Sequence, residues 1–361
     1  MLDSTGRRVR TLKLRSLMDV TLVIPGLLDA PASSLDAADA YTPALAGLLA
    51  TAPSPVSAGD SVASVICGVL GIARQRDWPV APWLARAAGI EDRANYWLCA
   101  DPATFAIGST DVRMRGLVRD LSEEHGATLL SALNEHFASD AIRFFAPAPS
   151  HWLIGAEAAQ ALETFPPDNV AGEPLADFLT MGPDAPRWRR WQNEIQMLLF
   201  EHRVNREREK AGRATVNAVW LWGSGTLAPV NGLAPTAALY ADSFLARELA
   251  RARGAEISPL PPSFSSLRGS AAQRPAWICM KELEVTGESD VVSRLRDVDQ
   301  EWLGPLMEAF TTREVSKLHI VATGRRGALR FDARRRSFMQ RFRLGRPRTR
   351  LAATLAVHQA S

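Results

Sequence analysis

Apolar positions along the chain alternate between short runs typical of buried strands and longer stretches with helical spacing. Residues 19–24 are apolar and β-branched and end in Pro25-Gly26, which predicts a buried strand followed by a loop. Residues 121–137 place leucines and a phenylalanine on one stripe, which predicts a helix. The same reasoning predicts further helices at 42–49, 61–70, 82–88, 187–201, 237–252 and 291–310, and further strands at 96–99, 105–107, 142–145, 152–154, 216–222, 276–281 and 317–323.

The alternation of strands and helices at both ends of the chain predicts an α/β fold, with a central sheet flanked by helices. The middle of the chain is more irregular and predicts an inserted α+β subdomain over residues 91–229. The α/β core is then discontinuous and comprises residues 18–90 and 230–332. Residues 1–17 are predicted to be a disordered extension or to result from a wrongly set start, in which case Met18 is the natural first residue. Residues 333–361 are predicted to be a basic C-terminal tail.

Composition is that of a soluble globular protein, with 47% apolar and 22% charged residues among 361. The three cysteines lie far apart without a CxxC pair, which indicates buried free thiols in a reducing compartment. Neither a signal peptide nor a membrane-spanning run is recognisable, so we expect a cytoplasmic protein without a membrane partner.

Charge is uneven along the chain. Residues 313–361 hold 13 Lys and Arg against two acidic residues. Such a basic end can bind nucleic acid or an acidic protein surface. A solvated, partly disordered end explains the same composition, and we favour that interpretation because few aromatic residues are interleaved with the arginines.

The densest group of chemically useful residues is the stretch HRVNREREKAGRATVNAVWLWGSG, residues 202–225, called the 202–225 block below. A Gly-Ser-Gly turn after a strand exposes backbone N–H groups to an anion, and Arg and His can bind phosphate or carboxylate. Asparagines that cap turns and tryptophans in a core are the alternative for each residue taken alone. The candidate ligand-binding residues are His202, Asn205, Arg208, Asn217, Trp220, Trp222, Gly223 and Gly225, joined by Asn193 and Gln196 on the preceding helix.

The spacing H-x-x-N-x-x-R-x-x-x-G followed by N-x-x-W-x-W-G-x-G resembles the archaeal-type cofactor-independent phosphoglycerate mutases, which belong to the alkaline phosphatase superfamily. Weaker similarity covers residues 41–45, 59–71, 297–299 and 321–324. Residues 188–199 are more similar to bacterial RpfE-type regulatory proteins. The resemblance implies an alkaline-phosphatase-like sheet and a phosphorylated small molecule as ligand.

The resemblance also implies two divalent metals, such as Mn or Zn, held by Asp and His at strand ends, and a serine nucleophile. Here the first strand ends in Pro25-Gly26, with Asp29 as the nearest carboxylate. Arg325 and Arg326 stand where the resemblance implies Asp and His. Ser61 and Ser64 are the serines nearest the nucleophile's place, and a serine at a helix start is typically a cap. We therefore predict no metal cofactor and assign no catalytic residue.

Three functions stay open from the sequence. The favoured one is a mutase-like protein that has lost its two-metal centre and regulates by binding a phosphorylated or anionic ligand or a protein partner. The second is an active mutase or phosphatase with divergent ligands, for which the candidates are Asp29, Asp60, Glu282 and Glu284. The third is a nucleic-acid-associated protein that uses the basic tail.

Overall fold

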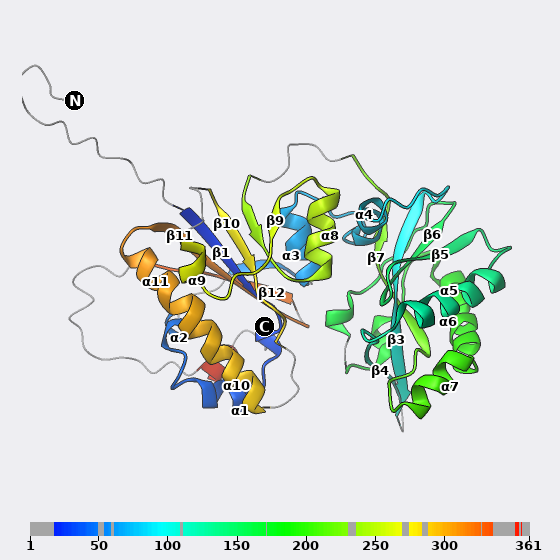
Figure 1. Cartoon of the computed structure of the whole chain (residues 1–361), viewed down its shortest axis with the longest axis horizontal. Helices are drawn as coiled ribbons and strands as arrows, with labels where there is room; N and C mark the ends of the chain where they lie inside the picture. Colours follow the sequence, from blue (N-terminus) through cyan, green and yellow to red (C-terminus); the bar gives the residue numbers. More distant parts are fainter. Residues whose placement is uncertain are drawn as a thin grey trace, which may run out of the picture.

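The computed structural model of the chain describes residues 18–49, 54–58, 61–108, 111–170, 172–229, 236–268, 274–283, 288–325, 327–334, 351–353 and 355. These residues form two sheets, each with helices packed on it (Figure 1). The predicted α/β class, with a largely parallel central sheet flanked by helices, is confirmed. No helix in this described part of the chain is long and apolar enough to cross a membrane.

The larger sheet has the strand order β2-β12-β11-β1-β10-β8-β9. Its parallel strands are β1 (Met18–Ile24), β8 (Ala238–Tyr240), β9 (Ile257–Ser258), β10 (Ala276–Cys279) and β11 (Val315–Gly324). At one edge β12 (Gly327–Asp332) pairs antiparallel with β11, and the outermost strand β2 (Ser54–Ala58) pairs antiparallel with β12. Because β1 is central and parallel to both β10 and β11, the carboxyl ends of these three strands meet at one edge of the sheet.

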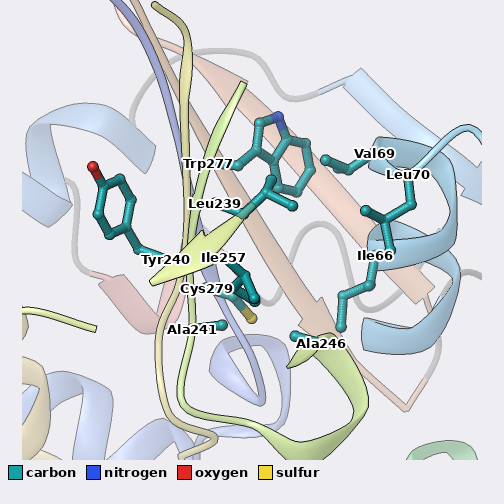
Figure 2. A pocket seen from close by; sticks show the side chains of 10 residues that line it. All are labelled: Ile66, Val69, Leu70, Leu239, Tyr240, Ala241, Ala246, Ile257, Trp277 and Cys279. Atoms are coloured by element: carbon teal, nitrogen blue, oxygen red, sulfur yellow. The ribbon is translucent and has the colours of Figure 1, made fainter. Parts of the chain in front are cut away.

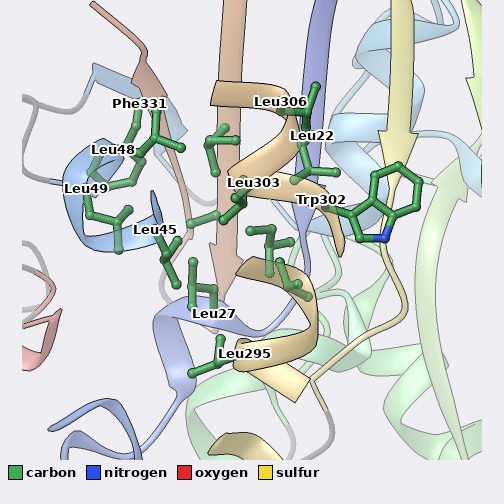
Figure 3. Packing of buried hydrophobic residues seen from close by; sticks show 14 of the residues in the cluster. Leu22, Leu27, Leu45, Leu48, Leu49, Leu295, Trp302, Leu303, Leu306 and Phe331 are labelled. Atoms are coloured by element: carbon green, nitrogen blue, oxygen red, sulfur yellow. The ribbon is translucent and has the colours of Figure 1, made fainter. Parts of the chain in front are cut away.

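Helices cover both faces of the larger sheet. On one face Val20, Leu22 and Ile24 of β1 pack into a core with several helices (Figure 3). These helices are α1 (Ala32–Ala38), α2 (Pro43–Leu49), α9 (Phe264–Arg268), α10 (Glu288–Asp297), the π-helical turn Val298–Leu303 and α11 (Gly304–Thr311). On the other face Val23 joins a second core with α3 (Val62–Val69), α4 (Val80–Ala87) and α8 (Phe244–Ala252).

The smaller sheet has the order β4-β3-β6-β5, with β7 paired to the free side of β3. Its strands are β3 (Tyr96–Ile107), β4 (Val112–Leu117), β5 (Ile142–Ala148), β6 (His151–Ala156) and β7 (Ala218–Gly225). On one face pack α5 (Glu123–His136), α6 (Ala185–Phe200) and α7 (Arg203–Lys210). All five strands lie within the predicted insertion 91–229; the division into domains stays a prediction.

The second core runs continuously from the larger sheet to the smaller one. Alternate residues of β3 and β7, among them Trp97, Trp220 and Trp222, share this core with Val23 and Val321 of the larger sheet. Helix α4 lies between the two, because it packs against α8 on one side and against β3 and β7 on the other (Figure 1). The two sheets are thus joined by a common apolar core.

Several predicted elements differ from the structure. The helix predicted over 237–252 is the strand β8 followed by α8, which begins only at Phe244. The strands predicted at 96–99 and 105–107 are one strand, β3, and the long helix predicted at 291–310 contains a π-helical turn. The additional elements β2, β4, β9, β12, α1, α7 and α9 were not predicted.

Part of the predicted basic tail packs against the core of the larger sheet. Leu351 and Leu355 are fully buried in that core, and the Leu351 N–H donates to a carboxylate oxygen of Asp39 at 2.9 Å. The clustered arginines between residues 335 and 350 lie outside the described residues, as do residues 1–17.

Candidate functional site

The 202–225 block begins as a helix start. His202 is the N-cap of α7, and its Nδ1 accepts a hydrogen bond from the Val204 N–H at 3.2 Å. Burial lowers the pKa of His202, and Arg203 and Arg206 lower it further. A lowered pKa favours the neutral imidazole, which alone can accept this bond.

Asn205 is buried and makes three hydrogen bonds to the main chain. Its Nδ2 donates to the carbonyl oxygens of Leu199 and Val216, each at 2.7 Å. Its Oδ1 accepts from the Val216 N–H at 2.8 Å. The side chain therefore connects the end of α6 to the segment that enters β7, and its hydrogen-bonding atoms are engaged within the protein.

Arg208 is fully buried, with 0% of its surface exposed. Its Nε donates to the Ala214 carbonyl oxygen at 2.7 Å, and its Nη2 lies 2.6 Å from the Asp120 carboxylate. A buried guanidinium needs such a partner because an unpaired buried charge is strongly destabilising. Arg208 thus joins the segment between α7 and β7 to the start of the α5 region.

Asn217 reproduces a pair of sheet hydrogen bonds with one residue of β3. Its Oδ1 accepts from the Phe105 N–H and its Nδ2 donates to the Phe105 carbonyl oxygen, both at 2.8 Å. Trp220 and Trp222 lie on one face of β7, as predicted, and both are buried. Their indole N–H groups donate to the Phe165 carbonyl oxygen at 2.8 Å and to Asp101 at 3.2 Å.

The Gly-Ser-Gly end of β7 is packed from both sides. Gly223 has a φ of 63°, and a Cβ there would lie 2.9 Å from the Cβ of Val80. A Cβ on Gly225 would lie 2.7 Å from Gln75 Oε1 and from Pro79 Cβ. These glycines are therefore required for the close approach of residues 75–80, which lead into the first turn of α4.

Ser224, between the two glycines, belongs to a buried network. Its hydroxyl donates to the Asp77 carboxylate at 2.7 Å and accepts from the Tyr96 hydroxyl at 3.0 Å. Asp77 also accepts from the N–H of Thr164 at 3.1 Å and from its hydroxyl. Burial nevertheless raises the pKa of Asp77.

The ten predicted ligand-binding residues do not share one surface. Trp220 and Trp222 belong to the core on one face of the smaller sheet, whereas α6 packs on the opposite face. Asn193 is exposed on α6 and Gln196 is half-buried there. The contacts above account for the buried polar side chains of the block without a ligand, and a ligand-binding role for the ten stays a prediction.

A different group of polar residues lies at the strand ends of the larger sheet. Asp29 follows β1 in a short 3-10 turn, Leu27–Asp29, and its two carboxylate oxygens accept from the Arg325 N–H at 3.1 and 2.9 Å. The Arg325 Nε lies 3.5 Å from the same carboxylate. Gly324 permits this approach, since a Cβ there would lie 2.7 Å from Leu28 Cβ and 3.0 Å from Asp29 Oδ1.

Arg325 also connects this edge to the part of the chain that carries the smaller sheet. Its Nη1 lies 3.1 Å from Glu173, and its carbonyl oxygen accepts from Asn169 Nδ2 at 2.6 Å. Burial raises the pKa of Asp29, and the neighbouring Arg325 opposes that rise.

The described residues at this edge do not fit a two-metal centre. The Asp29 carboxylate is engaged by Arg325, whose positive charge would repel a divalent cation. Cys279, the last residue of β10, is a buried thiol whose pKa burial raises to about 12. No group of three His, Cys, Asp or Glu that could hold a metal ion occurs among the residues that the structure describes. Two alternative ligands named above, Asp60 and Glu284, and also Arg326, lie outside that part.

The serines considered as nucleophiles form a helix cap. The Ser64 N–H donates to the Ser61 hydroxyl at 3.3 Å, and the Ser61 N–H donates to the Ser64 hydroxyl at 2.7 Å. This reciprocal capping box begins α3 and buries both side chains.

Beside this edge, the smaller sheet contributes a group that the sequence did not single out: Asp101, Arg119 and His151. Arg119 Nη1 lies 3.0 Å from His151 Nδ1 and donates to the Ser150 carbonyl oxygen at 3.0 Å. Asp101 is buried behind them, 3.7 Å from Arg119 Nη2 and 3.6 Å from His151 Nδ1. Asp101 is a charged residue within the mostly apolar strand β3, and this feature of the sequence could have indicated the group.

Asp168 connects this group electrostatically to the strand ends. Burial raises the pKa of Asp168, the Asp29 and Asp101 carboxylates raise it further, and Arg119 opposes the rise. The His151 ring stacks on Phe244, the first residue of α8, with centroids 4.1 Å apart and planes 7° from parallel. Arg119 and His151 therefore lie where the smaller sheet meets a helix of the larger one.

A separate apolar cavity of about 30 Å³ lies between α3, α8 and strands β8–β10 (Figure 2). Its lining includes Ile66, Leu239 and Trp277 and has no polar surface. A cavity of this size and lining suits the packing of a core and offers no partner to an anionic ligand.

The fold and the strand-end residues together define an α/β protein with a largely parallel central sheet, whose strand ends carry the Asp29–Arg325 ion pair. No family model matches the chain. It is 26% identical over 106 residues to a probable 2,3-bisphosphoglycerate-independent phosphoglycerate mutase of Geobacter sulfurreducens, covering 29% of this chain and 27% of the relative. It is also 26% identical over 135 residues to the corresponding mutase of Methanosarcina mazei, covering 33% and 34%.

Among solved structures, the chain is similar to the cofactor-independent phosphoglycerate mutase of Thermoplasma acidophilum, with 18% identity, a TM-score of 0.41 and coverage of 88% and 89% of the two chains. The matched segments span 27% and 34% of the length of these two curated relatives. The chain is a distant homologue of the cofactor-independent phosphoglycerate mutases.

Proposed function

We propose that this chain is a mutase-like protein that works by binding, and that it recognises a phosphorylated or carboxylated small molecule at Arg119 and His151. The observation that carries the proposal is the ion pair of Asp29 with Arg325 at the ends of β1 and β11. It places a guanidinium where the resemblance implies metal ligands. The output is regulatory, as in the RpfE-type proteins that residues 188–199 resemble.

The chemistry of phosphoryl transfer supports a binding role. A two-metal site activates the nucleophile and stabilises charge on the transferring group. A guanidinium can neutralise a bound anion, but it does not generate a nucleophile. The nearest serines, Ser61 and Ser64, are buried and bonded to each other in a helix cap, so neither is placed to attack a substrate.

The geometry of Arg119 suits an anion. Its side chain is 47% exposed, and its position is fixed by Asp101, His151 and the Ser150 carbonyl. A guanidinium held in this way presents donors in the planar arrangement that carboxylate and phosphate accept.

The neighbouring carboxylates would repel an anion if they carried unshielded charge, but each is compensated. Asp101 accepts from the Trp222 indole and faces Arg119, and Asp29 is paired with Arg325. Arg119 also lies near Asp168 and opposes the rise that burial causes in the pKa of that carboxyl. Arg119 thus balances these carboxylates, and its side chain, 47% exposed, is the guanidinium surface that an anion can reach.

Calorimetric titration of the full chain with 3-phosphoglycerate, and separately with inorganic phosphate, tests the proposal. The first probe is chosen because the distant relatives are named as phosphoglycerate mutases. We expect saturable binding that Arg119→Ala weakens by roughly 10–100-fold, the equivalent of one lost charge-assisted interaction of about 1.5–3 kcal/mol. Arg115→Ala is the matched control, since Arg115 is an exposed arginine on β4. No binding by the wild type, or equal binding by the Arg119→Ala variant, would refute it.

Binding should also tighten as the solution becomes more acidic. Because the pKa of Asp168 is raised, this carboxyl loses its charge at a higher pH than an ordinary aspartate, whose pKa is about 3.9. Protonation removes a negative charge beside Arg119. Titrations across a pH series should show this trend in the wild type and a flatter one in Asp168→Asn. A steeper dependence in the variant would contradict the assignment.

A further inference from the structure

Helix α6 presents an apolar stripe to solvent on the side away from its own sheet. Met197 and Phe200 are each 73% exposed, whereas Trp188, Ile195 and Leu199 of the same helix are buried. The exposed pair lies three residues apart, which places both side chains on one helical face. Figure 1 shows α6 beside α5 on the outer side of the smaller sheet. Two such side chains that adjoin on one helical face form an exposed apolar patch, which is typical of an interaction surface.

Charges at the two ends of this stripe have opposite sign. Arg189 and Arg190 are exposed in the first turns of α6, and Glu201 is exposed at its C-cap. Asn193 lies on the same face between them, with an exposed side chain. Arg190 also pairs with Glu194 of the same helix at 3.4 Å. From the N-terminal end to the C-terminal end, the exposed face otherwise runs from cationic through polar and apolar to anionic.

We propose that this face pairs with the same face of a second copy of the chain, with the two α6 helices antiparallel about a two-fold axis. Such an axis opposite position 195 sets Asn193 against Met197 of the partner subunit and Arg189 against Glu201 of the partner subunit. The same register brings Phe200 to Arg190 of the partner subunit, a cation–π arrangement. Two-fold pairing uses one patch twice, and a patch that changes sign from end to end is complementary to itself only when the copies run antiparallel.

The order of charges along this face of α6 favours a second copy of the chain over any other partner. A strongly basic or acidic partner would match only one end of the face and would be repelled at the other. Helix α6 has 16 residues and is thus about 24 Å long, which is short for a standard interface of about 1,600 Å² in total. We therefore expect a weak dimer whose population rises with protein concentration. This inference is independent of the proposed ligand.

Sedimentation velocity of the full chain over a concentration series tests the pairing. Glu201→Arg should shift the equilibrium to monomer, because it sets positive charge against Arg189 and Arg190 of the partner subunit. Arg189→Glu with Arg190→Glu should do the same, and the three substitutions together should restore the dimer. Because Arg190→Glu also removes the ion pair with Glu194, circular dichroism of each variant must show unchanged helix content before a shift to monomer is assigned to the interface. A wild type that stays monomeric at the highest concentration, or a dimer indifferent to both reversals, would overturn the proposal.

Cysteine cross-linking tests the register. Asn193→Cys combined with Met197→Cys should give a covalent dimer under mild oxidation. The native thiols Cys67, Cys99 and Cys279 are all buried and should not compete. The matched control is Ile107→Cys, at an 85% exposed position on the β3–β4 hairpin, which should remain monomeric. Cross-linking of the control as fast as the α6 variant would mean random collision and would count against the register.

Discussion

Replacing Asn205 by alanine separates a structural role of the 202–225 block from a ligand-binding one. The substitution removes three hydrogen bonds that join the carbonyl of Leu199 and both main-chain groups of Val216 to one buried side chain. No water can replace them readily, since Asn205 is only 4% exposed. The end of α6 and the entry to β7 lose their common partner.

The size of the effect follows from those three bonds. A typical hydrogen bond contributes about 0.5–1.5 kcal/mol net, and a buried group left unpaired costs about 1–3 kcal/mol. The Asn205→Ala variant should therefore lose roughly 2–5 kcal/mol of unfolding free energy, a large share of the total of about 5–15 kcal/mol for a typical domain. Its melting temperature should fall by about 5–15 °C.

Urea unfolding followed by tryptophan fluorescence is a suitable assay, because six of the ten tryptophans lie within residues 91–229. Asn193→Ala is the control, since Asn193 is an exposed asparagine on the neighbouring helix and its loss should change stability by less than about 0.5 kcal/mol. The structural account fails if Asn205→Ala is as stable as the control yet abolishes binding of 3-phosphoglycerate.

Four further substitutions test other contacts. Burial raises the pKa of Asp77, so its protonated form stabilises the fold fully below the ordinary aspartate pKa of about 3.9, and this stabilisation is lost as pH rises through the raised pKa. The melting temperature of Asp77→Asn should therefore fall less with rising pH than that of the wild type. An equal dependence of melting temperature on pH in both proteins would refute the linkage. Gly212 and Gly223 both have a positive φ, but a Cβ added at Gly223 alone would meet a neighbour, Val80 Cβ at 2.9 Å. In chemical denaturation, Gly212→Ala should lose about 1–2 kcal/mol of unfolding free energy, and Gly223→Ala about 1–3 kcal/mol more. Equal losses in the two variants would contradict the close contact. Asp299 accepts the first N–H groups of α2, so Asp299→Ala should lose about 0.5–2 kcal/mol in the same assay, and no loss would mean that this cap is dispensable.

The local pattern of apolar residues was sufficient to predict the helices and strands in which that pattern is regular over many residues. Strand β1 and the helices α5 and α6 lie within a few residues of their predicted bounds. The alanine-rich segment at 237–252 has helical composition throughout, yet its first residues, Ala238–Tyr240, pair with β10. That pairing depends on a strand nearly forty residues away, which no local window contains.

The site was harder to predict because the partners of its residues are distant in sequence. Asn217 bonds to Phe105, and Arg208 to Asp120, at separations of 112 and 88 residues. The sequence does not show these internal partners, so it leaves the polar cluster open to interpretation as a ligand site. Arg119 and His151 come from different elements and meet only in the folded sheet, so spacing could not single them out.

A ³¹P NMR spectrum of the full chain mixed with 3-phosphoglycerate, with added Zn²⁺ or Mg²⁺, tests the central claim most directly. If the protein binds through Arg119 without a two-metal centre, the 3-phosphoglycerate signal will shift or broaden in proportion to the protein added, and no other phosphorus signal will appear. The growth of a 2-phosphoglycerate or inorganic phosphate signal at a rate set by the protein concentration would contradict the account.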